Sequence, residues 1–201
     1  MNRQILTDLL RKRDFKAVRS ILEVMYTVDI AALLAELDDK EMILAFRLIE
    51  KAKAAEVFAE MSSSMQAYLV EMFTEKELKE LLDELYMDDT VDLLEELPAN
   101  LVTRILEQVD REKRAQINTI LNYPEDSAGS IMTAEYVGLK KRMTVEEAFA
   151  YIRRHGVDKE TIYTCYVMDA KRALEGVVTV KDLLMHPYEE VIGNIMDSHV
   201  I

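Results

Sequence analysis

Apolar residues recur with a period of twelve along the first 121 residues of the chain. One series of apolar positions is Leu37, Ile49, Met61, Phe73, Leu85, Leu97 and Val109, with Met25 and Leu121 extending it at its ends. Apolar residues also stand four and three positions before each central member, as Leu33 and Leu34 do before Leu37. Positions i, i+1 and i+4 share one side of a helix but not one side of a strand. The pattern therefore predicts one short helix per twelve residues, stacked in pairs as a repeat superhelix.

The predicted helices are too short to be stable alone, so they must be held by packing against their neighbours. Polar or helix-stopping residues mark the candidate boundaries between them: Asp38-Asp39, Ser62–Ser64, Asp88-Asp89 and Pro98. The series weakens at both ends, as expected of capping repeats.

The second part of the chain is built differently. Glycine is absent from the first 128 residues, and all five glycines lie in the last 73. The segment Tyr123–Thr133, YPEDSAGSIMT, contains Pro124 and Gly129 and is typical of a joint. After it, the pattern predicts a β-α-β-β-α order: a strand at 136–139, a helix from the Thr144 capping box to His155, strands at 161–168 and 174–180, and a helix from 181.

Composition narrows the class of function. The formal net charge is −13, which argues against nucleic-acid binding because phosphate backbones require basic surfaces. The same charge suits cations, or simply a solvated acidic surface. Cys165 is the only cysteine, so no internal disulfide and no thiolate metal cluster is expected. No apolar run is long enough to cross a membrane, and the N-terminus lacks the apolar core of a signal peptide.

Carboxylates are concentrated in residues 75–98, which hold ten Asp and Glu against two lysines. Asp88 and Asp92 are four residues apart and would repel each other on one helix face. Glu56 occupies the same slot of the twelve-residue repeat as Asp92. Carboxylate oxygens bind Mg²⁺ or Ca²⁺, and Mg²⁺ needs only one or two of them directly. The alternative is that Asp88 or Asp89 caps a helix and the others form a solvated face.

A second candidate lies at a strand–helix junction, in the segment Gly176–Asp182, GVVTVKD. The hydroxyl of Thr179 and the carboxylate of Asp182 would face whatever binds there. The alternative is a helix cap, with Thr179 as the N-cap and Asp182 as the acidic residue three positions later. The three histidines show no metal-ligand spacing, and no catalytic or phosphate-loop motif is present. We therefore expect a protein that is not an enzyme.

The segment Met132–Met196 resembles a CBS module. It has IMT near its start, GVVTVKDL at the second strand–helix junction and IGNIMD at its end. Together with the MDDTVDLLEELP helices and the YPEDSAG joint, the whole chain resembles the cytosolic part of the MgtE family of Mg²⁺ channels and transporters. On this reading the acidic helical domain covers residues 1–122, the joint 123–133, the first CBS module 134–197, and a second CBS motif begins at 198–201.

The resemblance implies a Mg²⁺-sensing regulatory region at the cytoplasmic face of the cell membrane. In that family, Mg²⁺ bridges acidic surfaces of the N domain, the CBS pair and a connecting helix, and so favours the closed pore of a dimeric protein. The family's N-domain carboxylates fall on Glu56, Asp88 and Asp92. Thr179 and Asp182 match the nucleotide-contacting pattern of CBS modules, which implies possible ATP binding.

The chain departs from the family pattern by stopping where the second CBS module would begin. The expected partners are therefore that module, the connecting helix, the transmembrane domain and a second copy of the chain. Thr164 and Lys181 also replace an aromatic residue and an arginine that some relatives use for nucleotide binding. Two other functions stay open: a protein-interaction superhelix with a CBS appendage that docks a basic partner, and an adenine-nucleotide sensor.

Overall fold

The computed structural model describes residues 3–124, 127–157 and 159–200. The chain divides into two compact units, residues 1–131 and 132–201, and each is described here by itself. Within the described residues, no helix combines the length and apolar character needed to cross a membrane.

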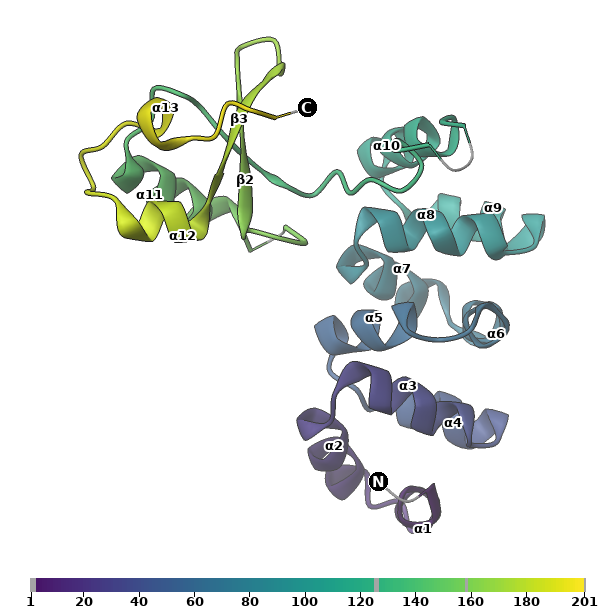
Figure 1. The fold of residues 1–201 in the computed structure, drawn as a ribbon. Helices are drawn as coiled ribbons and strands as arrows, with labels where there is room; N and C mark the ends of the chain where they lie inside the picture. Colours follow the sequence, from purple (N-terminus) through teal and green to yellow (C-terminus); the bar gives the residue numbers. More distant parts are fainter. Residues whose placement is uncertain (1–2, 125–126, 158, 201) are drawn as a thin grey trace. The chain divides into compact units, whose positions relative to one another are not determined.

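Unit 1 is a series of short helices that follow one another through the stack (Figure 1). Among the described residues they are α1 (Arg3–Arg11), α2 (Phe15–Val24), α3 (Thr27–Ala35), α4 (Asp39–Phe46), α5 (Lys51–Ala59), α6 (Ser63–Met72), α7 (Glu75–Glu84), α8 (Met87–Glu96), α9 (Ala99–Gln108) and α10 (Arg111–Leu121). Each begins twelve residues after the one before it. The predicted repeat is confirmed, and its register extends through both ends of the unit.

Alternate helices of unit 1 pack on one another. Helix α5 contacts α3 and α7, and α7 contacts α9, while α8 packs against α6 and α10. Contacts also join helices that differ by an odd number of repeats: α3 and α1 both contact α4, and α6 contacts α9.

The apolar slots that define the repeat form the core of unit 1. All seven residues four positions before the series of Leu37 to Val109 are buried: Leu33, Ala45, Val57, Leu69, Leu81, Leu93 and Ile105. The residues three positions before are also buried, except that Leu106 is partly exposed. Burial of these side chains between successive helices supplies the stability that each helix lacks alone.

The repeat ends its helices without glycine. At Met25, Phe73, Leu85, Leu97 and Val109 the helix stops at a residue of extended backbone conformation, and four of these five side chains are buried. An extended apolar residue turns the chain while packing into the core, so the left-handed conformation that favours glycine is not needed. These five helix ends therefore do not require glycine.

Cations near the starts of later helices cap the ends of earlier ones. Lys53 Nζ donates hydrogen bonds to the carbonyl oxygens of Glu23 (2.7 Å) and Met25 (2.6 Å), at the end of α2. Lys113 Nζ does the same for the carbonyls of Leu82 and Leu85, at the end of α7. A cation at a helix C-terminus satisfies carbonyls that have no partner within the helix and opposes the negative end of the dipole.

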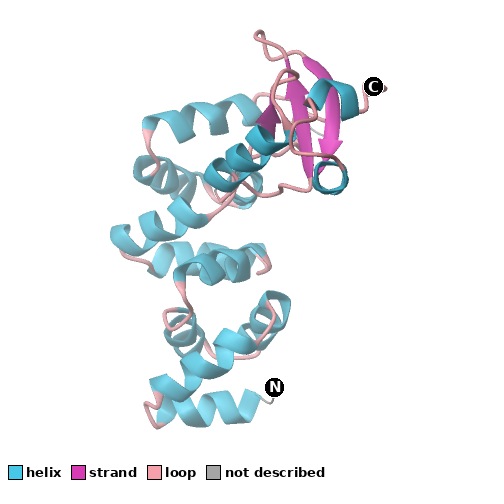
Figure 2. Ribbon diagram, turned by 90° about the vertical axis from the view of Figure 1, so that its left-hand side faces the viewer, coloured by secondary structure: helices cyan, strands magenta, loops and turns pink. Residues whose placement is uncertain are grey.

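Unit 2 is a small mixed sheet with helices (Figure 2). Its described elements are β1 (Val137–Leu139), α11 (Val145–His155), β2 (Thr164–Met168), β3 (Leu174–Thr179), α12 (Val180–Met185) and α13 (Ile192–Ile195). The strand order is β1-β2-β3, with β1 parallel to β2 and β2 antiparallel to β3. Its buried core is separate from that of unit 1 and includes Val137, Val167, Val178 and Leu183.

The predicted fold class is confirmed in both units, with small differences in unit 2. Thr144 forms the predicted capping box with Glu147, and α11 ends before Gly156. Strand β2 starts at Thr164 rather than at Thr161, because the preceding residues form a loop in which Tyr163 N–H bonds Thr161 Oγ1. Helix α13 was not predicted, since its four residues are too few to show helical periodicity.

Candidate metal-binding surface on helix α8

Helix α8 places its carboxylates without using Asp88 as a cap. The N-cap residue is Tyr86, with no side-chain cap bond, and Asp88 and Asp89 lie inside the first helical turn. The boundary expected at Asp88-Asp89 is therefore displaced, and capping by Asp88 is not what this helix uses. Both acids benefit from the positive end of the helix dipole, which favours anions in the first turn.

Asp88 carries an unsatisfied oxygen. Its Oδ1 atom is buried from water and has no hydrogen-bond partner. A buried carboxylate oxygen without a partner is unfavourable, because it has lost water and gained nothing in exchange. Such an oxygen is the kind of group that a cation would satisfy.

Asp92 lies one turn further along α8 and feels the same excess of negative charge. Its pKa is raised, first because the carboxylate is partly desolvated, and then because of the charges of Asp88 and Glu96. Asp88, Asp92 and Glu96 follow one another at intervals of four residues and so share one helix face. Sequence reasoning singled out Asp88 and Asp92 but missed Glu96, which the same four-residue spacing identifies. The Glu96 carboxylate accepts a hydrogen bond from Ser63 Oγ.

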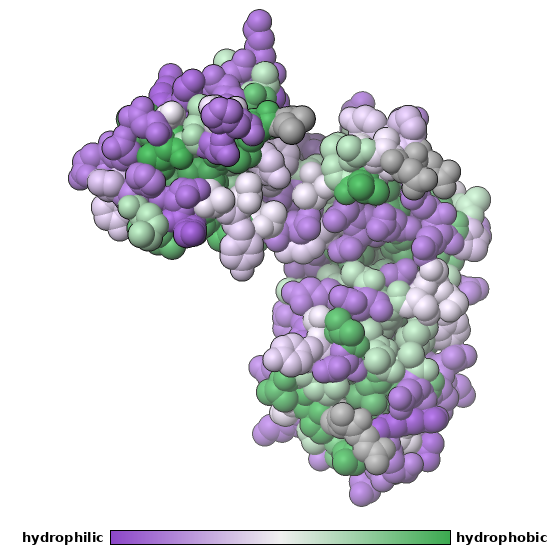
Figure 3. Space-filling view, viewed as in Figure 1, coloured by the Kyte–Doolittle hydropathy of each residue, from purple (hydrophilic) through white to green (hydrophobic). Residues whose placement is uncertain are grey.

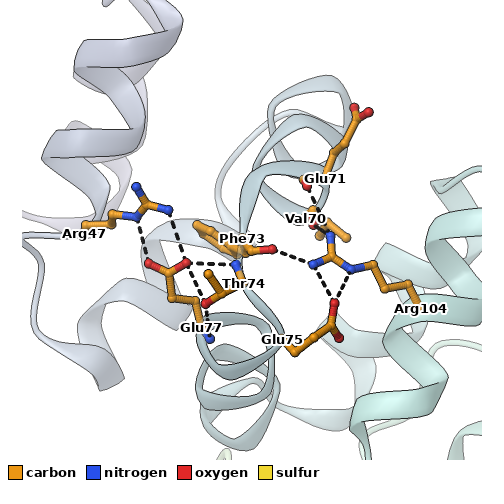
Figure 4. Close-up of polar contacts among 8 residues, drawn as sticks. All are labelled: Arg47, Val70, Glu71, Phe73, Thr74, Glu75, Glu77 and Arg104. Atoms are coloured by element: carbon orange, nitrogen blue, oxygen red, sulfur yellow. Dashed lines mark hydrogen bonds and ion pairs between the residues drawn. The ribbon is translucent and has the colours of Figure 1, made fainter.

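The neighbouring helix α7 shows what compensated carboxylates look like in this fold (Figure 4). Arg47 donates two hydrogen bonds to Glu77, at 2.8 and 3.2 Å, and Arg104 donates two to Glu75, at 3.0 and 2.9 Å. Burial alone would raise the pKa of Glu77, but hydrogen bonds from Thr74 and Arg47 outweigh it and lower that pKa.

Two further carboxylates of α7 also have cationic partners. Glu80 pairs with Lys51 and Lys76, and Asp83 pairs with Lys79. In the described part of the chain, no ion pair involves Asp88, Asp92 or Glu96. The negative charge of α7 is therefore largely neutralised within the fold, whereas that of α8 is not.

Glu56 is not brought into the α8 group. It is exposed on α5. Within the described residues, no three His, Cys, Asp or Glu side chains are close enough together to hold a metal ion. Glu56 and the Asp88–Asp92 pair are thus separate acidic positions, and a complete set of ligands would need oxygens from water or from another surface.

In unit 2, Thr179 and Asp182 form a capping box at the start of α12. Thr179 Oγ1 accepts from Asp182 N–H (3.1 Å), while Asp182 Oδ2 accepts from Thr179 N–H (2.9 Å) and Thr179 Oγ1 (2.5 Å). These hydrogen bonds, that from the Thr179 side chain first, lower the pKa of Asp182. The capping alternative is therefore realised, and any ligand would meet a preorganised pair at the strand–helix junction.

Cys165, His155 and His186 make contacts that belong to the packing and hydrogen bonding of the fold. Cys165 is buried in β2, and desolvation raises the pKa of its thiol to about 11. The Nδ1 atoms of His155 and His186 lie 3.0 and 2.7 Å from the carbonyl oxygens of Tyr151 and Asp182 in the last turns of their helices. Cys165 is thus part of the packed sheet, and these two histidines lie at helix ends.

The fold and the site together define a class: an acidic helical-repeat domain joined to a CBS module. A family model of the MgtE intracellular N domain matches residues 25–126, and a model of the CBS domain matches residues 128–189. The chain belongs to the MgtE family.

Curated relatives agree with this assignment. The chain is 36% identical over 200 residues to the magnesium transporter MgtE of Thermus thermophilus, covering 98% of this chain and 44% of the relative. It is 24% identical over 193 residues to the magnesium transporter MgtE of Bacillus subtilis, covering 96% and 43%. The chain thus spans less than half the length of these relatives. Both relatives are named as transporters, in agreement with the expected non-enzymatic role.

Solved structures agree over the whole fold. The crystal structure of the cytosolic domain of the Mg²⁺ channel MgtE in complex with ATP matches with a TM-score of 0.91 and 35% identity, covering 100% of this chain and 82% of that one. The soluble part of a magnesium transporter matches with a TM-score of 0.89 and 24% identity, covering 99% and 78%, which supports the fold. The chain is therefore homologous to the cytosolic region of an MgtE protein.

Proposed function

We propose that this chain is the Mg²⁺-sensing regulatory region of a magnesium channel or transporter, on the cytoplasmic face of the cell membrane. The observation that carries the proposal is the uncompensated charge of α8, where Asp88 has a buried, unpartnered oxygen and the pKa of Asp92 is raised. The donor set fits Mg²⁺, which binds carboxylate oxygens, retains several waters and needs few direct protein ligands. Glu56 would supply a second acidic position on the same domain.

The proposed switch follows from the sign of the electrostatic interaction. Acidic surfaces repel each other, and a divalent cation between them reverses that interaction. Mg²⁺ would therefore hold the α8 face against acidic groups of a second CBS module and a connecting helix, in a homodimer, and favour a closed pore. Because coupling is reciprocal, the arrangement that binds Mg²⁺ more tightly is the one that Mg²⁺ populates.

Thermal melting in a Mg²⁺ titration tests this proposal, with this chain compared with a longer one that includes a second CBS module and the connecting helix. We expect a large Mg²⁺-dependent rise in Tm only in the longer chain, because this chain would carry half of the site. At ten times its Kd a ligand stabilises by about 1.4 kcal/mol. The rise should disappear in Asp88→Asn/Asp92→Asn.

A matched control separates binding from charge screening. Asp83→Asn/Glu84→Gln changes the net charge equally on the adjacent helix α7 and should leave the Mg²⁺ response intact. NaCl at the same ionic strength should not reproduce the shift, because screening is not specific for divalent ions. If neither chain responds to Mg²⁺, the sensor proposal fails and docking of a basic protein partner becomes the better account of the acidic face.

A second candidate function is adenine-nucleotide binding by the CBS module. It is favoured by the preorganised Thr179–Asp182 pair at the strand–helix junction and by the relative that was crystallised with ATP. Calorimetric titration with ATP tests it, using Thr179→Val, which removes the hydroxyl, beside Thr179→Ser, which keeps it. Weaker ATP binding in Thr179→Val alone supports a direct contact. Equal binding in both variants would remove Thr179 from the site.

A further inference from the structure

The first two helices of unit 1 carry a charge opposite to that of the rest of the unit. Residues 3–24 contain six Lys or Arg and three Asp or Glu, whereas residues 25–124 contain ten and twenty-two. We call residues 3–24, helices α1 and α2 with their turn, the basic hairpin. Such a reversal at one end of an acidic domain gives that end a distinct electrostatic preference.

One cation of the basic hairpin serves the fold. Arg11 Nε donates to Glu41 Oε1 at 2.9 Å, and Thr7 Oγ1 donates to Glu41 Oε2 at 3.1 Å, which fastens α1 to α4. Two acids of the hairpin also have local partners: the Asp8 carboxylate accepts from Gln4 Nε2, and Asp14 accepts from Ala17 N–H as the cap of α2.

Four of the other five cations of the hairpin point to an external anion. Lys12, Arg13, Lys16 and Arg19 are all exposed, and in the described part of the chain none of them forms an ion pair. Elsewhere in the described part of unit 1, most arginines and lysines cap helix ends or pair with carboxylates, with Lys40 and Arg111 as exceptions. Four cations without ion pairs therefore lie within eight residues. In this they differ from most of the other cations of unit 1.

The backbone at Arg13 strengthens this inference. The hydrogen bonds Asp14 N–H to Leu9 O and Arg13 N–H to Leu10 O close the end of α1 as a Schellman motif, with Arg13 in the left-handed conformation at φ 57°. Glycine is the usual residue at this position because it adopts that conformation without a steric penalty. Arg13 is the one residue with positive φ among the described residues of unit 1. Arg13 thus adds an exposed cation at a position where glycine would be the easier residue.

Apolar side chains are exposed on the same hairpin and next to it. Phe15, the first residue of α2, is 37% exposed, and Val24 and Tyr26 at its other end are 83% and 82% exposed. Over the N-terminal helices, hydrophobic and hydrophilic atoms lie side by side on the face that Figure 3 shows. Exposed cations mixed with aromatic and aliphatic side chains are typical of surfaces that bind the headgroup region of a membrane.

We propose that the basic hairpin binds an anionic phospholipid surface through Lys12, Arg13, Lys16 and Arg19, with Phe15 inserting at the headgroup level. The shared chemistry is recognition of phosphate-bearing headgroups by exposed cations. The choice of a lipid surface over an acidic protein rests on the exposed apolar residues and on the proposed function, which places the chain beside a membrane. The binding itself does not involve the α8 carboxylates.

Co-sedimentation with vesicles tests the proposal on the whole chain, in chelator and low salt. We expect binding to phosphatidylcholine vesicles that contain roughly one-third phosphatidylglycerol, and none to pure phosphatidylcholine. The net charge of −13 opposes this binding, so its occurrence requires a local basic surface. Lys12→Gln/Lys16→Gln should lower the partition coefficient at least about tenfold, since each cation near an anionic membrane contributes substantially. Lys40→Gln/Lys76→Gln, with the same change in net charge outside the hairpin, should not.

Arg13→Gly distinguishes a binding role from a structural one. Glycine fits the left-handed position, so the Tm should stay unchanged or rise, while vesicle binding falls. A lowered Tm with unchanged vesicle binding would show that Arg13 acts structurally, and would overturn its assignment.

Three outcomes overturn the lipid proposal. The first is no binding to anionic vesicles at low salt, and the second is equal loss of binding in the hairpin and control variants. The third is binding to soluble polyglutamate as tight as to the vesicles, with Phe15→Ala having no effect, which would identify an acidic polypeptide as the partner. A Mg²⁺ response that requires Asp92 can be present or absent in each case, so the two proposals can fail separately.

Discussion

Arg104 and Arg47 are two arginines of unit 1 whose removal should have very different effects on stability (Figure 4). Arg104 donates hydrogen bonds to the backbone carbonyls of Val70, Glu71 and Phe73, at the end of α6, as well as to Glu75. Among the described residues, the hydrogen bonds of the Arg47 side chain go to the carboxylate of Glu77. The Arg104 side chain is 23% exposed, and that of Arg47 is 43% exposed.

The expected magnitudes follow from these partners. Arg104→Gln leaves carbonyl oxygens at a partly buried helix end without their charged donor, which should cost about 2–3 kcal/mol. Arg47→Gln breaks an exposed ion pair, which is worth about 0–1 kcal/mol. For a unit of this size, 1 kcal/mol lowers Tm by roughly 3 °C. We therefore expect Tm to fall by about 6–9 °C for Arg104→Gln and by less than about 3 °C for Arg47→Gln.

Urea unfolding and thermal melting, both followed by circular dichroism, measure the free energy of unfolding and the Tm of both variants under the same conditions. The two substitutions remove the same charge, so the difference between them reports on the carbonyl contacts. Raising the salt concentration should weaken the effect of Arg47→Gln more than that of Arg104→Gln, because exposed pairs are screened. Equal losses of stability in the two variants would refute the idea that cations reaching back to earlier helices hold the superhelix together.

Three further predictions concern the two candidate sites and the buried thiol. Asp92→Asn should stabilise the fold by about 0.5–1 kcal/mol at neutral pH without divalent ions, because it removes two like-charge pairs. The pKa of Asp92 is raised in the folded state, so at pH values above it the Asp92 charge destabilises the fold. As the pH falls through this pKa the carboxylate becomes protonated, and the Tm difference between wild type and variant should disappear. Thr179→Val should cost about 1 kcal/mol through loss of the cap, measured by melting, whereas Thr179→Ser should be near neutral. Cys165, with a thiol pKa of about 11, should react with a thiol reagent at pH 8 roughly a hundredfold more slowly in the native chain than in urea.

The periodic part of the fold could be predicted from the sequence because each helix repeats one pattern. The spacing of Leu37, Ile49 and their equivalents fixes where helices end, and the structure begins a helix every twelve residues. The contacts between helices could not be predicted this way. Equivalence in sequence suggested that Glu56 and Asp92 share a surface, and that stays a prediction, because within the described residues no three acidic side chains gather into a metal site. Repeat position gives the side of a helix, whereas tertiary packing decides which helices are neighbours.

The candidate metal surface was only half visible in the sequence. A count of carboxylates in residues 75–98 does not show that those of α7 are paired with cations and those of α8 are not. The cations that pair with α7 carboxylates such as Glu77 are distant from them in sequence. Arg47 and Glu77 are 30 residues apart, as are Lys53 and the carbonyl of Glu23. Only the structure shows that Glu77 pairs with Arg47, whereas the described residues give Asp92 no ion pair.

The distribution of cations in unit 1 explains why an unneutralised face on α8 is useful. Lys53, Arg104 and Lys113 are engaged at helix ends, where they hold the superhelix together. A permanent arginine partner for Asp92, like that of Glu77, would neutralise the face at every ion concentration. Without one, the energy of bringing this face against another acidic surface depends on the divalent cation in solution. A surface whose interactions depend on Mg²⁺ must lack cationic side chains of its own, although the rest of the fold needs such side chains for stability. Helix α8 meets the first condition, and helix α7, with its paired carboxylates, illustrates the second.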